Sequence, residues 1–462
     1  MEIIKNHPPT AEKIREGRGM RKIFSRLGDI LIFALVLSML TMAALYIGAA
    51  RTSSTSAARL HEKLPSGVRV RGAQERAGAD VGAAGWLGVA DAAVGCDGNG
   101  GYAFAEEDMA KKLYAFAAPL ISAILSESPT ATAMQADAAA QALSGDFVRL
   151  DLYTPLPIHA IGLLVGTAKN CGVDVLADAL ILSFDAAGRA VLYAAAGDDI
   201  YLFDGAAAEN RTTLAALAGA EALHPYTSVA HALFLPKAAP TLSPISLSRS
   251  DITTAMTETE IRLLFTLFGF NPEKQAPRRD ADGISTVEPQ GQMEISNEKI
   301  QYLAAEGSAL PLSDLVGTAD GADAVFSAAA ELLRRVEALT NPHLFGDANL
   351  YLAAVGRTGG VYTLQFGLSA DGVPILLDGD AIFLTLTATE DGVTAVNIRS
   401  CTVTRAPTRT TRFAADWQYA HAARRGDVLD FALLYAVQSG TDAPTLTEAE
   451  WYAAFAETEA IQ

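Results

Sequence analysis

The sequence predicts an α+β protein in which a single N-terminal transmembrane helix is followed by a two-lobed ectodomain with antiparallel sheets and flanking helices. Three observations lead to this prediction. Residues 30–50 form a run of twenty-one residues without a charged side chain. Downstream, stretches with apolar residues at helical spacing alternate with short strand-like runs that Asp-Gly turns separate. A segment rich in proline and serine, residues 236–251, divides these elements into two groups.

The uncharged run, Ile30 to Ala50, is predicted to be the membrane anchor. As a helix it would span about 31 Å, which matches the hydrocarbon core of a bilayer. Residues 1–29 carry seven Lys or Arg and four Asp or Glu, a balance of +3. The positive-inside rule therefore places this basic tail in the cytoplasm and everything after Ala50 outside, in a single-pass protein of the cell membrane. A cleavable signal peptide ending at the small residues 48–50 is the alternative, but the length of the run and of the tail before it favours an uncleaved signal anchor.

The charge balance and the cysteines limit the classes of partner and of fold. The net charge is −18, so without the +3 tail the rest of the chain carries −21. Such a domain repels phosphate backbones, and we expect no nucleic-acid partner. Half of the residues are hydrophobic, which indicates a folded chain with a large core. Cys96, Cys171 and Cys401 lie far apart without a CxxC motif, so the sequence leaves their disulfide pairing open.

The first lobe is predicted at residues 88–235, after a juxtamembrane stalk at 51–87 that shows no sustained period. Apolar spacing predicts its helices, and alternation between turn residues predicts its strands. Two prolines, Pro155 and Pro157, are expected to end the first strand. The predicted helices are Glu106 to Leu125 and Ala131 to Leu143, and the predicted strands are Phe147 to Tyr153, Ala179 to Phe184, a short strand after the turn at Asp185 to Gly188, and Asp199 to Phe203.

Residues 236–251 are predicted to be a linker without helix or strand, and residues 252–462 the second lobe. This lobe opens with a helix that Thr257 and Glu260 cap and Gly269 ends, before Asn271-Pro272. A longer amphipathic helix and an antiparallel meander with turns at Asp371-Gly372 and Asp391-Gly392 are expected after it. The predicted elements are a hairpin of Ile284 to Glu288 and Met293 to Ser296, a strand at Ile300 to Leu303, a helix at Ala322 to Leu339, and strands at Tyr351 to Val355, Val361 to Leu368, Ile382 to Thr387 and Val393 to Val403.

The sequence contains no motif for catalysis or for a cofactor. It lacks GxSxG, HExxH, a GxxxxGK[ST] phosphate loop and a GxGxxG after a strand. His224 and His231 are seven residues apart, but Pro225 interrupts a shared helix and no third metal ligand is suitably spaced. The acidic groups at 106–108, 198–199 and 390–391 fall at an expected helix start and at turns. We therefore predict no catalytic, cofactor-binding or metal-binding residues and no cofactor.

The predicted anchor offers a possible contact face for a neighbouring helix. Small or weakly polar residues recur on one side of it, at Ala34, Ser38, Thr41, Ala44 and Gly48. Small residues let two backbones approach closely, and the Ser38 and Thr41 hydroxyls can form hydrogen bonds across the contact. The abundance of alanine throughout the chain explains the same pattern without any partner. Both interpretations remain open at this point.

Three strings in the second lobe have a recognisable pattern: Leu264 to Pro272, Asp282-Gly283 to Glu288 with Gln292 to Ser296, and Leu364 to Ile398 with its Asp-Gly turns. Together with the basic tail and the anchor, these strings resemble the YycH/YycI family, whose members are surface-anchored regulators of the WalK-type sensor histidine kinase in Gram-positive bacteria. The resemblance covers the anchor and most of residues 255–405, and the first lobe matches in outline. Ectodomains with PepSY-like or germination-protein sheets share such patterns.

The resemblance implies a non-enzymatic function. The anchor would pack beside the membrane helices of a sensor histidine kinase, with a second anchored regulator as a further partner, and the ectodomain would bias the kinase between signalling states at the cell wall side of the membrane. An anchored extracytoplasmic enzyme or cell-wall-binding protein is the alternative, and a sporulation or germination structural protein is the third class.

Overall fold

The computed structural model divides the chain into two compact units, Met1–Gly72 and Ala73–Gln462, and every residue that it describes lies in the second. The predicted tail, the anchor at 30–50 with its five contact-face residues, and the stalk up to residue 85 lie outside the described residues. The residues described are 86–105, 107–127, 130–134, 137–167, 175–185, 188–197, 199–208, 211–228, 234–249, 252–280, 283–316, 321–340, 344–412, 414–415, 418–419, 428–437 and 446–455.

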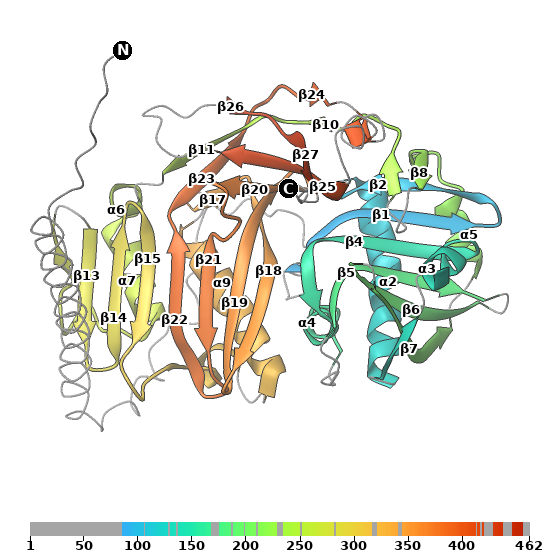
Figure 1. Ribbon diagram of the computed structural model, residues 1–462. Coiled ribbons are helices and arrows are strands. Elements are labelled where there is room, and N and C mark those ends of the chain that lie inside the picture. The colour runs from blue at the N-terminus through green and yellow to red at the C-terminus, as the bar shows by residue number, and fades with distance from the viewer. Residues whose placement is uncertain are drawn as a thin grey trace, which may run out of the picture. The chain divides into compact units, whose positions relative to one another are not determined.

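The fold is α+β with mainly antiparallel sheets, as the sequence predicts, and each predicted lobe has a large sheet of its own (Figure 1). The first is seven-stranded in the order β2-β1-β4-β5-β6-β7-β3, and every neighbouring pair is antiparallel. Its strands are β1 (Val89–Cys96), β2 (Asn99–Phe104), β3 (Ala131–Met134), β4 (Asp146–Pro157), β5 (Leu176–Phe184), β6 (Arg189–Ala196) and β7 (Asp199–Ala208).

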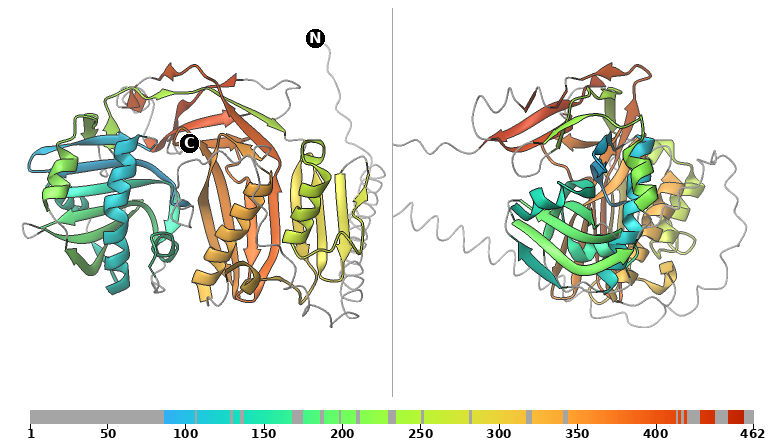
Figure 2. Two further views of the ribbon diagram at one scale, coloured as in Figure 1. Left: turned by 180° about the vertical axis from the view of Figure 1, so that it is seen from behind. Right: turned by 90° about the vertical axis from the view of Figure 1, so that its right-hand side faces the viewer.

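The long helix α2 (Asp108–Glu127) crosses one face of this sheet, with its apolar stripe against β1, β6 and β7 (Figure 2). Among the described residues it is the one helix long and apolar enough to cross a membrane. Eight of its side chains are buried, including Leu113, Ile121 and Ile124 at 0% exposure. Its hydropathy is therefore that of a core helix. The shorter helices of this lobe are α3 (Asp137–Ala142), α4 (Ile158–Leu164) and α5 (Arg211–Ala218).

Two local predictions in the first lobe are wrong. The helix expected over 131–143 is a strand, β3, followed by the short helix α3, because Ala131–Met134 gains a hydrogen-bonded partner in β7 at the edge of the sheet. Strand β4 runs on to Pro157 instead of ending before Pro155. Its register against β5 shifts between Asp151 and Leu156, and this bulge accommodates the exposed Pro155 because no ladder hydrogen bond is required there.

The predicted linker contains two strands, and a third ends at its first residue, so the expectation that it is free of regular structure is wrong. They are β9 (Phe234–Pro236), β10 (Thr241–Leu242) and β11 (Ile245–Arg249). β11 pairs with strands more than 150 residues later in the sequence, in a four-stranded sheet of order β17-β23-β11-β26. The remaining small strands are β8 (Tyr226–Ser228), which pairs with β9, β24 (Thr410–Thr411), which pairs with β10, and β17 (Phe345–Gly346), β23 (Cys401–Arg405) and β26 (Leu446–Thr447) of the four-stranded sheet.

The large sheet of the second lobe has twelve strands in the main order β12-β13-β14-β15-β22-β21-β19-β20-β25-β27, and β16 and β18 pair with β22 and β19. The predicted hairpin and meander lie here. A single strand is expected over 393–403, but the structure has two strands there. They are separated because the chain leaves the sheet at the buried Ser400, whose N–H donates to the Glu298 carbonyl at 2.8 Å. The strands are β12 (Arg278–Arg279), β13 (Gly283–Glu288), β14 (Gly291–Ser296), β15 (Lys299–Ala304), β16 (Leu310–Pro311), β18 (Asn349–Thr358), β19 (Val361–Ala370), β20 (Val373–Leu377), β21 (Leu384–Ala388), β22 (Gly392–Arg399), β25 (Val428–Val437) and β27 (Glu450–Phe455).

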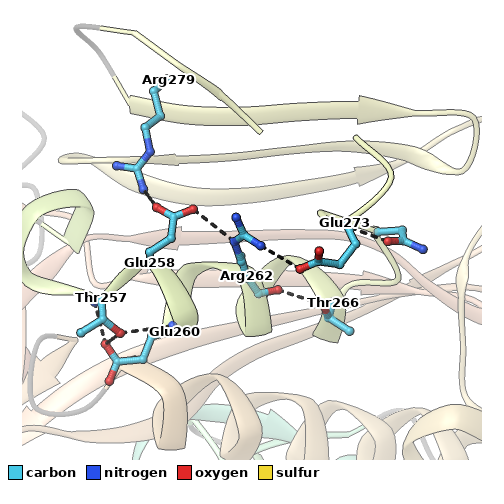
Figure 3. Close-up of polar contacts among 8 residues, drawn as sticks. Thr257, Glu258, Glu260, Arg262, Thr266, Glu273 and Arg279 are labelled. Atoms are coloured by element: carbon cyan, nitrogen blue, oxygen red, sulfur yellow. Dashed lines mark hydrogen bonds and ion pairs between the residues drawn. The ribbon is translucent and has the colours of Figure 1, made fainter. Parts of the chain in front are cut away.

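Helix α7 (Glu258–Leu267) forms as its sequence predicts (Figure 3). The Thr257 hydroxyl accepts from the Glu260 N–H, and the Glu260 carboxylate accepts from the Thr257 N–H at 2.7 Å, which is a complete capping box. Gly269 ends it at φ +84°, a conformation that glycine adopts without strain. Arg279 of the edge strand β12 forms an ion pair with Glu258, so the helix start is tied to the sheet edge.

The two main helices of the second lobe, α7 and α9 (Gly321–Thr340), lie on the same face of the twelve-stranded sheet (Figure 2). We call this the inner face. Nine residues of α9 are buried, among them Leu332 and Val325 at 0% exposure. On the sheet side the Phe268 ring lies 5.1 Å from that of Tyr302. The short helices α6 (Ile252–Ala255) and α8 (Ser313–Val316) complete the lobe.

Candidate functional site

The opposite, outer face of the twelve-stranded sheet carries a row of polar side chains. Strand register aligns one residue from each of six consecutive strands, and alternation directs all of them away from α7 and α9. In the ribbon no described helix lies over this face (Figures 1 and 2). We call these residues the polar row: Ser285, Glu294, Gln301, Asn397, Thr385 and Gln365.

A depression of about 300 Å³ lies at one end of the polar row. Gln365, Thr385 and Asn397 supply amide and hydroxyl groups to it, and an ion pair lies at its rim. In that pair Arg399 Nη2 is 2.5 Å from Asp380 Oδ2, and both side chains are more than 40% exposed. The Ile382 N–H donates to Asp380 Oδ1 at 2.9 Å, which orients the carboxylate. The depression therefore offers both hydrogen-bond donors and acceptors but no nucleophile paired with a base.

The polar row is nearly neutral although the chain outside its basic tail carries −21. Its one acidic member, Glu294, lies 3.3 Å from Lys299 Nζ. Asp380 is likewise balanced by Arg399. A partner with a neutral or acidic surface therefore meets less repulsion here than over the rest of an acidic domain. Sequence reasoning identified these strands but not the row, because only the register between strands aligns residues that lie up to 112 positions apart.

A second group of ionisable residues lies on the first sheet, on the face opposite α2. Arg149 and Asp151 alternate along β4, and Arg149 Nε donates to Asp151 Oδ1 at 2.8 Å. Burial raises the pKa of Asp91, in β1, well above its ordinary range. The hydrogen bond from the Tyr102 hydroxyl lowers this pKa, whereas the negative charge of Asp151 raises it further. Burial, together with Asp91, also raises the pKa of Tyr102. These groups interact on one sheet face, where the Nη1 atom of Arg149 is buried and makes no hydrogen bond to the described residues. The charges at alternate positions of FVRLDLY could have suggested this arrangement.

Two residues that the sequence analysis treated separately, Glu107 and His224, form a contact. His224 Nε2 lies 2.8 Å from Glu107 Oε1, and Glu107 Oε2 accepts from the Phe104 N–H at 3.0 Å. The Tyr102 N–H donates to the His224 carbonyl at 2.8 Å. The pair joins the start of α2 and the segment before β8 to strand β2. These hydrogen bonds hold the three elements together at the edge of the sheet.

The β1–β2 hairpin brings together Cys96, Asp97 and Asp146, whose ligand-type atoms lie within 4.8 Å of one another. Asp146 accepts from the Asp97 N–H at 3.0 Å, and Asp97 has φ +52° in the turn. The geometry is that of a hairpin turn held by a neighbouring carboxylate. Cys96 and Cys401 are both buried, and burial raises the pKa of the Cys401 thiol to about 12. Cys171 lies outside the described residues.

Two pairs of aromatic side chains are in contact at the junction between the two large sheets. The Trp86 ring lies 4.7 Å from Phe366, and the Tyr153 ring lies 4.9 Å from Tyr351. Burial raises the pKa of Tyr351 to about 12, so its phenol stays protonated. The contacts described between β4 and β18 bring no carboxylate or imidazole together at this place.

Comparison with known proteins gives one structural similarity. No family model matches the chain, and no curated protein matches it. A structural neighbour is YycH from Bacillus subtilis. Its crystal structure aligns with 80% of this chain and 94% of its own, at 11% identity and a TM-score of 0.48. YycH belongs to the family that the strings of the second lobe resemble.

The first string covers the end of α7 and the turn after it, and the other two strings lie in the twelve-stranded sheet. Leu264, Phe265, Phe268 and Phe270 of the first string are buried on the inner face, where Phe268 and Phe270 contact Tyr302. The second string forms the β13–β14 hairpin, and the third runs from β19 to β22. The second and third strings therefore supply both faces of these strands, and they contain every residue of the polar row except Gln301.

Proposed function

We propose that the protein is a non-enzymatic, single-pass membrane protein whose extracytoplasmic domain regulates a two-component sensor histidine kinase. The observation that carries the proposal is the contact between aromatic rings at the junction between the lobes. An enzyme with its site between two lobes would have a cleft with convergent acid, base or nucleophile there. This chain has aromatic rings in contact instead, which supports a domain that acts through its surfaces.

The kinase as partner follows from the resemblance of the second-lobe strings, and the membrane location from the predicted anchor. In this proposal the small residues of the anchor, Ala34, Ser38, Thr41, Ala44 and Gly48, pack against a membrane helix of the kinase. A second anchored regulator would share that contact. Binding shifts the kinase between its states only if the protein contacts those states differently.

The ectodomain contact is proposed at the depression in the polar row. It is a concave part of a nearly neutral face over which no described helix lies, and its amides and hydroxyls can pair with the backbone or side chains of an extracytoplasmic kinase domain. An arginine at Gln365 would add length and charge within the depression. The matched control is Gln292→Arg, at an exposed position of β14 on the same face but away from the depression.

A membrane pull-down from the native host tests both contacts. We expect the full-length protein to recover one histidine kinase, and recovery to fall when Ala34, Ser38, Ala44 and Gly48 are replaced by leucine. Ala43→Leu, which a helical period places on the other side of the run, is the control and should leave recovery unchanged. We also expect Gln365→Arg to lower recovery about tenfold, as for a surface contact of ordinary strength, and Gln292→Arg to leave it unchanged.

Other outcomes overturn the proposal. Recovery of cell-wall polymer or of wall-synthesis enzymes through the ectodomain, without a kinase, would support the wall-binding or enzyme class. Equal kinase recovery by the leucine variant and the wild type would remove the anchor contact, and equal recovery by the two arginine variants would remove the depression as the ectodomain contact.

A further inference from the structure

The first described residues of the chain enter the domain between its two large sheets. Trp86 and Leu87 are 5% and 6% exposed, although they stand at the end of the segment predicted to be a stalk. Trp86 contacts Phe366 of β19, at an interplanar angle of 73°. Three residues later the chain is already β1 of the other sheet, where Val89 pairs with Leu152 of β4. The segment 86–88 therefore touches both lobes before the first strand begins.

The backbone of this segment is fixed on the first-lobe side. The Tyr153 N–H of β4 donates to the Gly88 carbonyl at 2.8 Å, and the Val89 N–H donates to the Leu87 carbonyl at 2.9 Å. The next residue of β4, Thr154, donates its hydroxyl to the Ala353 carbonyl of β18 at 2.9 Å. A hydrogen bond between residues 199 positions apart thus joins the two sheets directly beside the entering chain.

Two glycines make room for the tyrosines of the junction. A Cβ at Gly88 would lie 2.4 Å from Tyr153 Cδ2 and 3.1 Å from Tyr351 Cβ. A Cβ at Gly367, on β19, would lie 2.3 Å from Tyr351 Cζ. Both rings therefore lie directly against backbone, and neither glycine tolerates a side chain without movement of a ring. Such close-packed contacts transmit displacement instead of absorbing it.

We propose that residues 86–88, with Tyr153, Tyr351 and Phe366, form a coupling joint that sets the two lobes relative to each other. The joint is continuous with the chain that leads back toward the predicted anchor. Displacement of Trp86 removes the ring that covers Phe366 and loosens the Gly88 to Tyr153 contact, so a movement of the preceding chain changes the setting of the lobes. Interfaces of this kind have a small number of discrete arrangements, which suits them to a switch. This inference does not depend on which partner the protein has.

The test is a distance measurement between the lobes of the full-length protein in lipid nanodiscs. Spin labels are placed through unnatural amino acids at two exposed positions, Thr132 on β3 and Gln292 on β14. We expect one narrow distance distribution for the wild type and for Trp86→Phe, which keeps an aromatic ring, and a broadened distribution for Trp86→Ala. Hydrogen exchange of the Tyr153 amide should also become about tenfold faster in Trp86→Ala, because the loss of the indole ring makes local opening of the segment around Gly88 easier.

Two further variants keep the result decisive. Phe268→Ala removes a buried ring of similar size from the inner face of the second lobe, away from the junction, and should leave the distribution narrow. Gly88→Ala keeps Trp86 but displaces the Tyr153 ring, and should shift the distribution even if Trp86→Ala fails to fold. An unchanged distribution in Gly88→Ala, or equal broadening in Phe268→Ala and Trp86→Ala, would overturn the joint.

Discussion

Replacement of Asp371 by asparagine should destabilise the protein, and do so only above acidic pH. Asp371 lies in the turn between β19 and β20, and its side chain is 8% exposed. Its carboxylate accepts from the Ser243 N–H at 2.8 Å and from Arg405 Nη1 at 2.8 Å. It thereby ties the twelve-stranded sheet to β23 of the four-stranded sheet and to the segment before β11. The Tyr435 hydroxyl, which donates to the Ser243 carbonyl at 2.6 Å, lies beside it.

The expected cost follows from the contacts that asparagine cannot make. Its Oδ1 can still accept from Ser243, but its NH₂ then faces the Arg405 guanidinium. One charge-assisted hydrogen bond of about 1.5–3 kcal/mol is lost. Because Arg405 is 38% exposed, water replaces part of the interaction, and we expect a loss of about 2 kcal/mol in the free energy of unfolding. Asparagine tolerates the φ of +48° at this position as aspartate does, so no backbone strain is added.

The pH dependence distinguishes this explanation from a packing defect. Burial alone would raise the pKa of Asp371, but the hydrogen bonds from Ser243 and Arg405 outweigh it and lower the pKa below the ordinary value. A carboxyl group with a lowered pKa stabilises the fold above its unfolded-state pKa of about 4, and this contribution is lost as the pH falls through the folded-state pKa. The difference in the free energy of unfolding between wild type and Asp371→Asn should therefore be largest at pH 7 and decrease below about pH 4.

The assay is urea unfolding of the full-length protein in nanodiscs at several pH values, with hydrogen exchange of the Ser243 amide as a local readout. The control is Glu298→Gln, which removes a carboxylate that is 71% exposed and paired with an equally exposed Arg249. This control should change the midpoint very little. The reasoning would be refuted if the stability difference between wild type and Asp371→Asn were the same at pH 7 and pH 3. It would also be refuted if Asp371→Asn were no less stable than Glu298→Gln at pH 7.

The remaining predictions concern the helices of the second lobe. Thr257→Ala removes the capping box of α7 and should cost about 1 kcal/mol, whereas Thr257→Ser keeps the hydroxyl and should cost little; equal thermal midpoints for the two would contradict the cap. Leu332→Ala, at a 0% exposed position of α9, should lower the free energy of unfolding by about 2–5 kcal/mol because it leaves a cavity under the sheet. Thermal unfolding measures this against the control Leu263→Ala, at an exposed position of α7, and a loss no larger than in the control would contradict the packing of α9.

The sequence by itself determined the elements whose signals are local. The capping box at Thr257, the apolar stripe and Gly269 lie within thirteen residues, so α7 could be predicted with both of its ends. The β13–β14 hairpin and α9 followed from alternation and helical period in the same way. In these cases the residues that stabilise an element are its own neighbours in the chain.

Tertiary structure decided the rest, because the stabilising partner lies far away in sequence. β11 is a strand because it forms hydrogen bonds with β23, more than 150 residues later in the chain. Ala131–Met134 is a strand because it pairs with β7. The polar row exists only through strand register, and the aromatic junction only through contacts between Trp86 and Phe366 and between Tyr153 and Tyr351. No local pattern encodes which distant residue a side chain will contact. The polar row and the aromatic junction, which are both proposed to act in this protein, depend on such long-range contacts.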